Sequence, residues 1–340
     1  MRIWLRLFPY GGKVCLPLWK AGQAMIQVQR LTKRYGSVTA VDQISFEIGR
    51  GEIVGLLGPN GAGKTTTMRV LTTYLPPTSG HALLCGHDVL DEPLEVRRRV
   101  GYLPENVPLY TEMRVREYLR HRSRLKDMPR ARQRQAISEL ITRCGLADVE
   151  HRILGQLSRG FRQRVGLAEA MIHDPDILIL DEPTSGLDPI QIREVRGLIR
   201  ELGDRHTILL STHIMSEVEA VCGRVIIISR GRIAVDDQID ALRLDKAILV
   251  EARGPAESIR SVLLCVEGVS RVSINGREEG FASFEIHTRD GLDVREAICQ
   301  KLTANGWTLR NLGLQRSSLE ERFVEAVTSD ALAREAAEAS

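Results

Sequence analysis

The sequence predicts an α/β protein built from two domains, and three observations lead to this fold class. Three short apolar runs rich in β-branched residues, at 53–57, 177–180 and 207–212, have the length and composition of buried strands. A glycine-rich turn joins the first run to residues 65–72, where apolar residues recur at helical spacing. The length of 340 residues is too large for one small domain and suits two.

The glycine-rich turn has the spacing of a phosphate-binding loop, G-x-x-x-x-G-K-[ST]. Its glycines allow a tight curl that brings backbone N–H groups close to an anion, and the next helix adds free N–H donors and its positive dipole end. Lys64 would place a positive charge on the β- and γ-phosphates, and Thr65 would offer a hydroxyl to Mg²⁺. We therefore expect nucleotide contacts from Gly58, Pro59, Asn60, Gly61, Ala62, Gly63, Lys64, Thr65 and Thr66.

Composition narrows the class of protein. Hydrophobic residues make up 43% of the chain and charged residues 27%, as in ordinary globular proteins. The net charge of +3 is too small to argue for a nucleic-acid partner, and we expect none. The six cysteines are scattered with no C-x-x-C pair, which argues against a zinc site and against a disulfide framework.

Residues 1–24 differ from the rest of the chain. Basic residues, prolines and glycines interrupt every apolar run there, so we expect neither a transmembrane helix nor a signal peptide. We expect a poorly ordered N-terminal extension before a first strand that begins near Met25. The alternative is a short amphipathic segment lying on a membrane, anchored by Trp4, Leu5, Leu7, Phe8 and Trp19.

The segments before and after the phosphate-binding loop are predicted to form short strands and helices. Residues 26–31 and 41–48 predict two strands joined by a turn at 33–36, which contains Tyr35. An aromatic ring there could stack on a purine, and the alternative is a half-buried turn tyrosine. Further on, we expect strands at 81–85 and 100–104 around a helix at 93–99, the second strand ending at Glu105.

Residues 113–173 change to helical spacing and carry nine basic residues between Arg114 and Arg134. This cluster indicates either a solvated helix surface or a docking face for an acidic partner or lipid headgroups. Ser158 precedes a long helix and suits its N-cap position. Because a helix start also attracts anions, the same feature could face a phosphate.

Two apolar strands end in polar side chains. The strand at 177–180 leads into Asp181 and Glu182, and the strand at 207–212 leads into His213. At the carboxyl edge of a parallel sheet beside the phosphate loop, Asp181 can hold Mg²⁺ and Glu182 can activate water. His213 would contact a phosphate. Residues 225–235 then predict a hairpin around Gly231.

These motifs, in this order, resemble the ATP-binding subunit of an ABC transporter across residues 25–240. The resemblance implies a P-loop NTPase (RecA-like) core at residues 25–243, with an antiparallel β subdomain and a helical subdomain at about 106–173. It assigns adenine stacking to Tyr35, the Q-loop position to Glu105, and Walker B and catalytic roles to Asp181 and Glu182. Further positions are the signature motif at Ser158 and Gly160, the D-loop at Asp188 and the switch histidine at His213.

Two departures from the family pattern concern these roles. The signature L-S-G-G-Q appears as Leu157-Ser158-Arg159-Gly160-Phe161, so the polar contact of the glutamine is lost. Glu105 replaces the Q-loop glutamine, and its carboxylate can ligate Mg²⁺ or water but cannot donate a hydrogen bond while ionised. Neither change removes a group needed for hydrolysis.

Residues 102–106, the variant signature and residues 181–189 together resemble the ATPases of ABC-2 type exporters, especially the gliding-motility-like branch. The resemblance implies ATP and Mg²⁺ as cofactors, Lys64, Glu182 and His213 as catalytic residues, and a homodimer that closes on ATP. It implies a separate integral membrane permease and a peripheral location at the cytoplasmic face of the cell membrane. The alternative is a soluble ABC-type ATPase acting on ribosomes or nucleic acid.

The C-terminal part follows a different pattern. Between residues 247 and 313 the order strand–helix–strand–strand–helix–strand indicates an α+β ferredoxin-like unit, which we place at residues 247–328. Asn275-Gly276 predicts the hairpin turn between its middle strands. A last helix is expected from Ser317, and the alanine- and glutamate-rich tail at 329–340 should fray.

Overall fold

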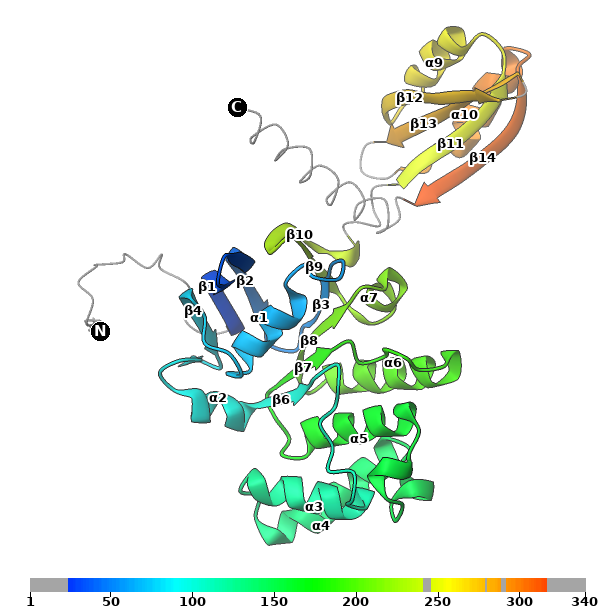
Figure 1. The fold of residues 1–340 in the computed structure, drawn as a ribbon. Coiled ribbons are helices and arrows are strands. Elements are labelled where there is room, and N and C mark those ends of the chain that lie inside the picture. The colour runs from blue at the N-terminus through cyan, green and yellow to red at the C-terminus, as the bar shows by residue number, and fades with distance from the viewer. Residues whose placement is uncertain (1–23, 241–245, 279, 289–291, 317–340) are drawn as a thin grey trace, which may run out of the picture.

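The computed structural model describes residues 24–240, 246–278, 280–288 and 292–316, which form three β-sheets with helices between them (Figure 1). Of the extension expected at 1–24, residues 1–23 lie outside the described residues and Ala24 begins the first strand, and the last helix and the tail also lie outside the described residues. Within the described residues, no helix is both long and apolar enough to cross a lipid bilayer.

The first sheet is antiparallel and has the strand order β2-β1-β4-β5. Its strands are β1 (Ala24–Tyr35), β2 (Val38–Gly49), β4 (Ser79–Leu84) and β5 (His87–Asp88). The predicted turn at 33–36 is wrong, because β1 continues to Tyr35, which pairs with Val38 across a turn that begins at Gly36. Gly36 has a φ of 57°, a conformation that favours glycine at this position.

The second sheet forms the centre of the molecule, with the order β10-β9-β3-β8-β7-β6. Five of its strands are parallel neighbours and β10 is antiparallel to β9. This confirms the predicted α/β class and the hairpin around Gly231. The strands are β3 (Ile53–Leu57), β6 (Val100–Leu103), β7 (Ile177–Asp181), β8 (Thr207–Thr212), β9 (Arg224–Ser229) and β10 (Arg232–Gln238).

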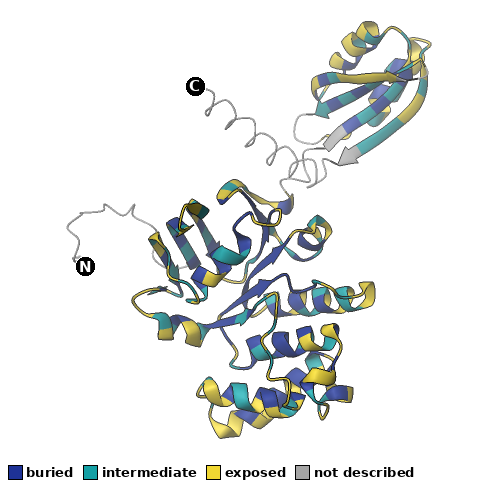
Figure 2. Ribbon diagram, in the orientation of Figure 1, coloured by how far each residue is buried: buried dark blue, intermediate teal, exposed yellow. Residues whose placement is uncertain are grey.

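Both faces of the central sheet are buried, as Figure 2 shows. Side chains alternate across β7, so that Ile177 and Ile179 join a core with the antiparallel sheet and helix α1 (Lys64–Leu71). Leu178 and Leu180 join a second core beneath the helices on the other face. This two-sided burial explains why the strand is apolar at every position until Asp181.

The helices on the second face include α5 (Arg159–Met171), α6 (Pro189–Gly203) and α7 (Met215–Val221). Helices α3 (Val115–Leu125) and α4 (Arg130–Arg143) pack beside α5 and form the expected helical region. The short helix α2 (Pro93–Arg99) precedes β6, as predicted. Lys126 ties the end of α3 to the central part by donating a 2.9 Å hydrogen bond to the Arg97 carbonyl.

The third sheet is antiparallel, with the order β12-β13-β11-β14. It has its own core, centred on residues such as Phe284 and Ile248, beneath two helices. The chain order is strand–helix–strand–strand–helix–strand, as predicted. The elements are β11 (Lys246–Arg253), α9 (Ala256–Leu264), β12 (Val269–Glu278), β13 (Phe281–Thr288), α10 (Arg295–Ala304) and β14 (Thr308–Arg316).

The predicted hairpin turn at Asn275-Gly276 is wrong. Strand β12 runs through both residues to Glu278, and Gly276 pairs with Ser283 on β13. The register shifts between Ile274 and Gly276, so the extra residue is absorbed as a bulge. The chain reverses next to Gly280, whose φ of 81° suits a tight turn.

Candidate functional site

The loop between β3 and α1 has a shape that requires glycine. A Cβ on Gly58 would lie 2.4 Å from the Ile228 carbonyl oxygen, and one on Gly63 would lie 2.5 Å from the Ala40 carbonyl oxygen. Gly61 and Gly63 also adopt φ values of 79° and 108°, which side chains disfavour. Gly63 is the N-cap of α1, so the loop ends where a helix presents its free N–H donors. This geometry fits an anion such as a phosphate.

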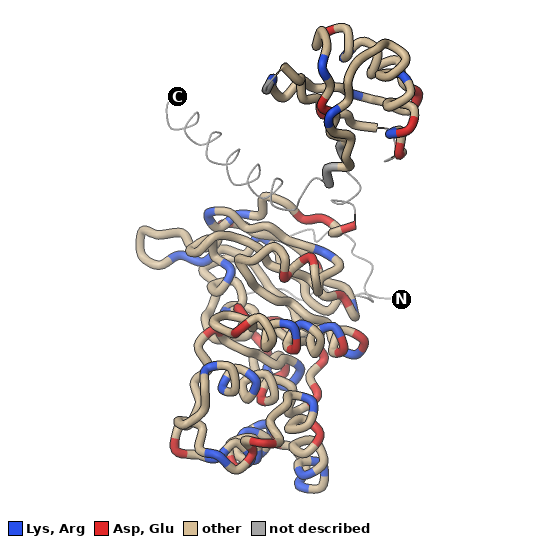
Figure 3. Tube along the Cα trace, turned by 90° about the vertical axis from the view of Figure 1, so that its right-hand side faces the viewer, with Lys and Arg blue, Asp and Glu red and all other residues tan. Residues whose placement is uncertain are grey.

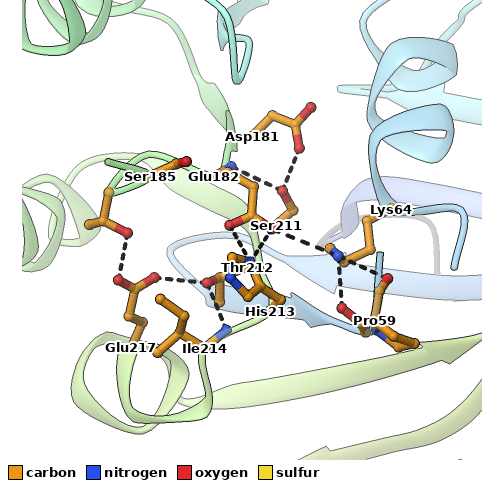
Figure 4. A network of polar contacts seen from close by, with 12 residues as sticks. Pro59, Lys64, Asp181, Glu182, Ser185, Ser211, Thr212, His213, Ile214 and Glu217 are labelled. Carbon is orange, nitrogen blue, oxygen red and sulfur yellow. Dashed lines mark hydrogen bonds and ion pairs between the residues drawn. The ribbon is translucent and has the colours of Figure 1, made fainter. Parts of the chain in front are cut away.

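Lys64 is the first residue of α1, and its side chain is 6% exposed. Its Nζ donates to the carbonyl oxygens of Gly58 at 2.7 Å and Pro59 at 3.2 Å, inside the loop (Figure 4). It also lies 3.7 Å from Oε1 of Glu182. Burial lowers the pKa of Lys64, and the charges of Glu182 and Asp181 oppose that change. The ammonium group is therefore held where it can bind a phosphate oxygen.

Asp181 is completely buried at the end of β7. Its Oδ1 accepts hydrogen bonds from Ser211 Oγ at 2.5 Å and from Thr65 Oγ1 at 3.2 Å. Its Oδ2 is buried and has no hydrogen-bond partner among the described residues. Burial raises the pKa of Asp181, while the two hydroxyl donors counteract the rise. A buried carboxylate oxygen without a partner, next to a threonine hydroxyl, fits the ligand set of a divalent cation.

Glu182 follows in a strained backbone conformation with a φ of 48°. Its N–H donates to the Ser211 carbonyl oxygen at 3.2 Å and to Ser211 Oγ at 3.1 Å. Its carboxylate lies 3.0 Å from Nδ1 of His213, which is half exposed at the end of β8. Burial raises the pKa of Glu182, and contacts with His213 and Lys64 oppose the rise. A carboxylate with a raised pKa suits proton transfer.

The other predicted site residues lie outside this cluster. Tyr35 is 46% exposed at the end of β1, with Lys33 Nζ 5.4 Å from its ring centre. Glu105 is exposed after β6, yet its charge acts on both Lys64 and Asp181. Glu105 is therefore close enough to act electrostatically on the cluster, and no hydrogen bond or ion pair of the described residues joins Tyr35 to it.

The segment at Ser158 and the loop at Asp188 lie beside each other. Ser158 caps α5 by accepting a 3.4 Å hydrogen bond from the Phe161 N–H. Arg159 donates to Ser185 Oγ at 3.3 Å. Asp188 caps α6 through the N–H groups of Ile190 and Gln191, at 3.0 and 2.9 Å.

Gly160 packs so closely on α6 that a Cβ there would lie 2.2 Å from Gln191 Oε1. Among the hydrogen bonds and ion pairs of the described residues, none joins Ser158, Gly160 or Asp188 to the phosphate loop. The structure thus brings together Lys64, Thr65, Asp181, Glu182 and His213, and it does not bring Ser158 or Gly160 to them.

Comparison with known proteins identifies the family. The family described as "ABC transporter" matches residues 41–185. The ABC transporter ATP-binding protein YxlF of Bacillus subtilis is 33% identical over 303 residues, which cover 89% of this chain and 99% of that protein. The chain belongs to the ABC transporter family. As a member, it binds and hydrolyses ATP.

Other relatives of this ABC protein are named for resistance and transport. The daunorubicin resistance ATP-binding protein DrrA3 of Streptomyces coeruleorubidus is 34% identical, covering 92% of this chain and 98% of that protein. A solved structure titled as the ATP-binding subunit of an ABC transporter is 30% identical with a TM-score of 0.60. It covers 64% of this chain and 92% of that chain.

One residue of the ABC site is absent from the sequence-based predictions. Ser211 joins Asp181 and Glu182 by contacting a side chain of the first and the backbone of the second. It pairs with Asp181 in the β7–β8 register. A serine near the end of an otherwise apolar strand indicates a polar contact there. Its partner can be named only once the register of the two strands is known.

Proposed function

We propose that the chain is the ATP-hydrolysing subunit of an ABC-2 type exporter and that Glu182 activates the attacking water. The cluster of Lys64, Asp181, Glu182 and His213 carries this proposal. The Glu182 carboxylate is buried and lies between Lys64, which can bind phosphate, and His213, which can hold the carboxylate in place. In this arrangement the base, the phosphate ligand and the orienting group converge on one point.

The remaining nucleotide contacts follow from the same geometry. The N–H groups of the loop from Gly58 to Thr66 surround the phosphates, and Lys64 neutralises the β- and γ-phosphates. Tyr35, half exposed, supplies a ring face for the adenine. His213 stabilises negative charge as the γ-phosphate leaves.

Asp181 and Thr65 are the residues that would hold Mg²⁺, through the unpartnered Oδ2 of Asp181 and the hydroxyl of Thr65. When bound, Mg²⁺ neutralises charge on the β- and γ-phosphate oxygens. Glu105 is close enough to act on Asp181 electrostatically, and its carboxylate can bind the ion directly or through water. Ser211 keeps Asp181 oriented so that its second oxygen remains available.

We further propose that two copies of the chain share each nucleotide. Ser158 is the exposed N-cap of α5, a helix of 13 residues whose start carries free N–H donors. Because Ser158 and Gly160 are not joined to the loop of their own chain, their anion-binding side is available to a γ-phosphate held by a second copy. Asp188, on the neighbouring loop, would lie in the same interface.

The domain limits are part of this proposal. Residues 25–243 would form the ATPase domain, and residues 247–328 a regulatory or assembly domain. The separate hydrophobic core of the C-terminal sheet supports this division.

The transport role and the location rest on the relatives. DrrA3 is named for daunorubicin resistance, and the protein BcrA of Bacillus licheniformis, 32% identical, for bacitracin transport. We infer that this chain drives a separate integral membrane permease from the cytoplasmic face of the membrane. The basic residues of α3 and α4, which are coloured blue on the Cα trace in Figure 3, would lie toward acidic groups there. The exposed ones include Arg120, Arg124, Arg130, Arg132 and Arg134.

The test is Glu182→Gln in the full chain, with Glu139→Gln on the exposed face of α4 as the matched control. Glu182→Gln keeps the shape and removes the base, so ATP turnover should fall by at least ~100-fold. ATP binding should persist, and size-exclusion chromatography with ATP should show a longer-lived dimer. Normal turnover by Glu182→Gln would overturn the assignment.

A further inference from the structure

Glu217, on α7, is a buried carboxylate to which neither the sequence nor the proposed reaction assigns a task. It is 3% exposed. Its Oε1 accepts a 2.5 Å hydrogen bond from Thr184 Oγ1, and its Oε2 accepts a 2.8 Å hydrogen bond from Thr212 Oγ1. Arg196 lies 3.6 Å from Oε1. Both carboxylate oxygens are thus occupied by side chains from other segments.

The two threonines belong to the segments that carry the proposed reacting groups. Thr184 lies two residues after Glu182, and Thr212 lies one residue before His213. Both threonines are buried, with exposures of 5% and 0%. Figure 4 shows Glu217 joined to Thr212 beside the contact between Glu182 and His213. One carboxylate therefore connects the loop of the base to the loop of the histidine.

The backbone at Glu182 needs such a restraint. Its φ of 48° is a conformation that a non-glycine residue keeps only when the surroundings hold it. Ser211 holds the N–H side of Glu182. Thr184, bound to Glu217, holds the chain on the other side. Glu217 lies in the first turn of α7, where a carboxylate can stabilise a helix simply by facing its N–H groups. Here both oxygens of Glu217 instead accept hydrogen bonds from side chains outside α7, so helix stabilisation alone does not explain its contacts.

We propose that Glu217 is a positioning residue for ATP hydrolysis: through Thr184 and Thr212 its carboxylate holds the Glu182 and His213 segments in register. The inference rests on the proposed function of Glu182 and His213. Small displacements of a reacting group lower turnover steeply, and a displacement of about 1 Å can cost ~100-fold. Glu217 does not contact the phosphate loop in any hydrogen bond or ion pair of the described residues, so nucleotide affinity should not depend on it.

The test compares Thr184→Val and Thr212→Val with Thr184→Ser and Thr212→Ser in the full chain. Valine keeps the shape and removes the hydroxyl, whereas serine keeps the hydroxyl. We expect kcat to fall by roughly tenfold in each valine variant, with KM for ATP changed by less than about twofold. The serine variants should retain more than about half of the wild-type kcat, since the hydrogen bond to Glu217 is kept. Glu219→Gln, exposed on the same helix, is the matched control and should leave kcat unchanged.

A second measurement separates positioning from general loss of structure. In the Glu182→Gln background, adding Thr184→Val should not lower the residual single-turnover rate further, because the base whose segment Thr184 holds is already absent. If a valine variant does not fold, Glu217→Gln, which keeps the volume, replaces it and should show the same lowered kcat. The proposal is overturned if kcat is unchanged in the folded valine variants, or if the serine variants lose as much as the valine variants.

Different results would overturn the role of Glu217 and the proposed function on which it rests. Absence of ATP hydrolysis by the wild-type chain would overturn the assignment of Glu182 and His213. Hydrolysis by the wild type together with unaltered kcat in every Thr184, Thr212 and Glu217 variant would overturn the role of Glu217 alone.

Discussion

Ser211 Oγ donates a 2.5 Å hydrogen bond to Asp181 Oδ1 and accepts a 3.1 Å hydrogen bond from the N–H of Glu182. The hydroxyl therefore fixes two consecutive carboxylate-bearing residues at once. Asp181 and Ser211 are direct neighbours across the parallel strands β7 and β8, so the contact is set by sheet register. Its geometry leaves the second oxygen of Asp181 without a partner in the described part of the chain.

Ser211→Ala should weaken both the fold and the reaction. A lost hydrogen bond to a buried charged group is worth about 1.5–3 kcal/mol in the free energy of unfolding. ATP turnover should fall by roughly tenfold, because Glu182 loses one backbone restraint. Urea unfolding and steady-state hydrolysis measure the two effects. Ser138→Ala, on the exposed face of α4, should change neither quantity.

Gly63→Ala should prevent nucleotide binding. The new Cβ would approach the Ala40 carbonyl oxygen to 2.5 Å at a residue whose φ is 108°. We expect a loss of more than about 2 kcal/mol of stability and no ATP binding in equilibrium dialysis.

The control for Gly63→Ala is Gly197→Ala on the exposed face of α6, where a Cβ would meet nothing within 4 Å. Alanine suits a helix interior better than glycine, so this variant should gain up to about 1 kcal/mol. Similar losses of stability and ATP binding from both substitutions would contradict the conclusion that the loop requires glycine at position 63.

Asp181→Asn should raise the Mg²⁺ concentration that half-saturates hydrolysis by at least ~10-fold, since a neutral amide is a weaker ligand for a divalent cation. Removal of divalent cations with a chelator should stop hydrolysis by the wild type. Binding of the nucleotide itself should persist in part, because Lys64 and the loop N–H groups remain. Unchanged metal dependence in Asp181→Asn would show that the cation is held elsewhere.

His173 should make the folded state sensitive to acid. It lies 3.4 Å from Lys126 Nζ, and burial, followed by the charge of Lys126, lowers its pKa to about 3. Below pH 6.5 the unfolded chain binds a proton at His173 that the folded chain does not, so stability falls as pH falls. Between pH 6.5 and pH 5 this should cost up to about 2 kcal/mol.

The measurement is the free energy of unfolding of wild type and His173→Asn at both pH values. The variant lacks the titrating ring and should lose less stability on acidification. Equal losses in the two proteins would mean that His173 binds protons alike in the folded and unfolded states.

Much of this fold can be predicted because local pattern and tertiary role agree. The strand at 177–180 is apolar at every position because both of its faces are buried, and Gly58 and Gly63 are required by close backbone contacts. The Asn275-Gly276 turn misleads because a local turn signal is overridden by strand pairing that extends past it.

The bonds of Glu217 cannot be predicted from local pattern, because Thr184 is 33 residues away and meets it only through packing. The proposed contact between Ser158 and a phosphate likewise cannot be predicted from local pattern, because a second chain would hold that phosphate.

The alternation of side chains along β7 has a consequence for how the protein tolerates mutation. Ile179 and Leu180 are adjacent in sequence but belong to different cores, and the same strand ends in Asp181. A change of volume on either side of the sheet therefore displaces the same carboxylate. Variation in residues far from the nucleotide should therefore be limited by its effect on that one strand end. Substitutions in the two hydrophobic interiors should be coupled through the strand between them, which itself should change slowly.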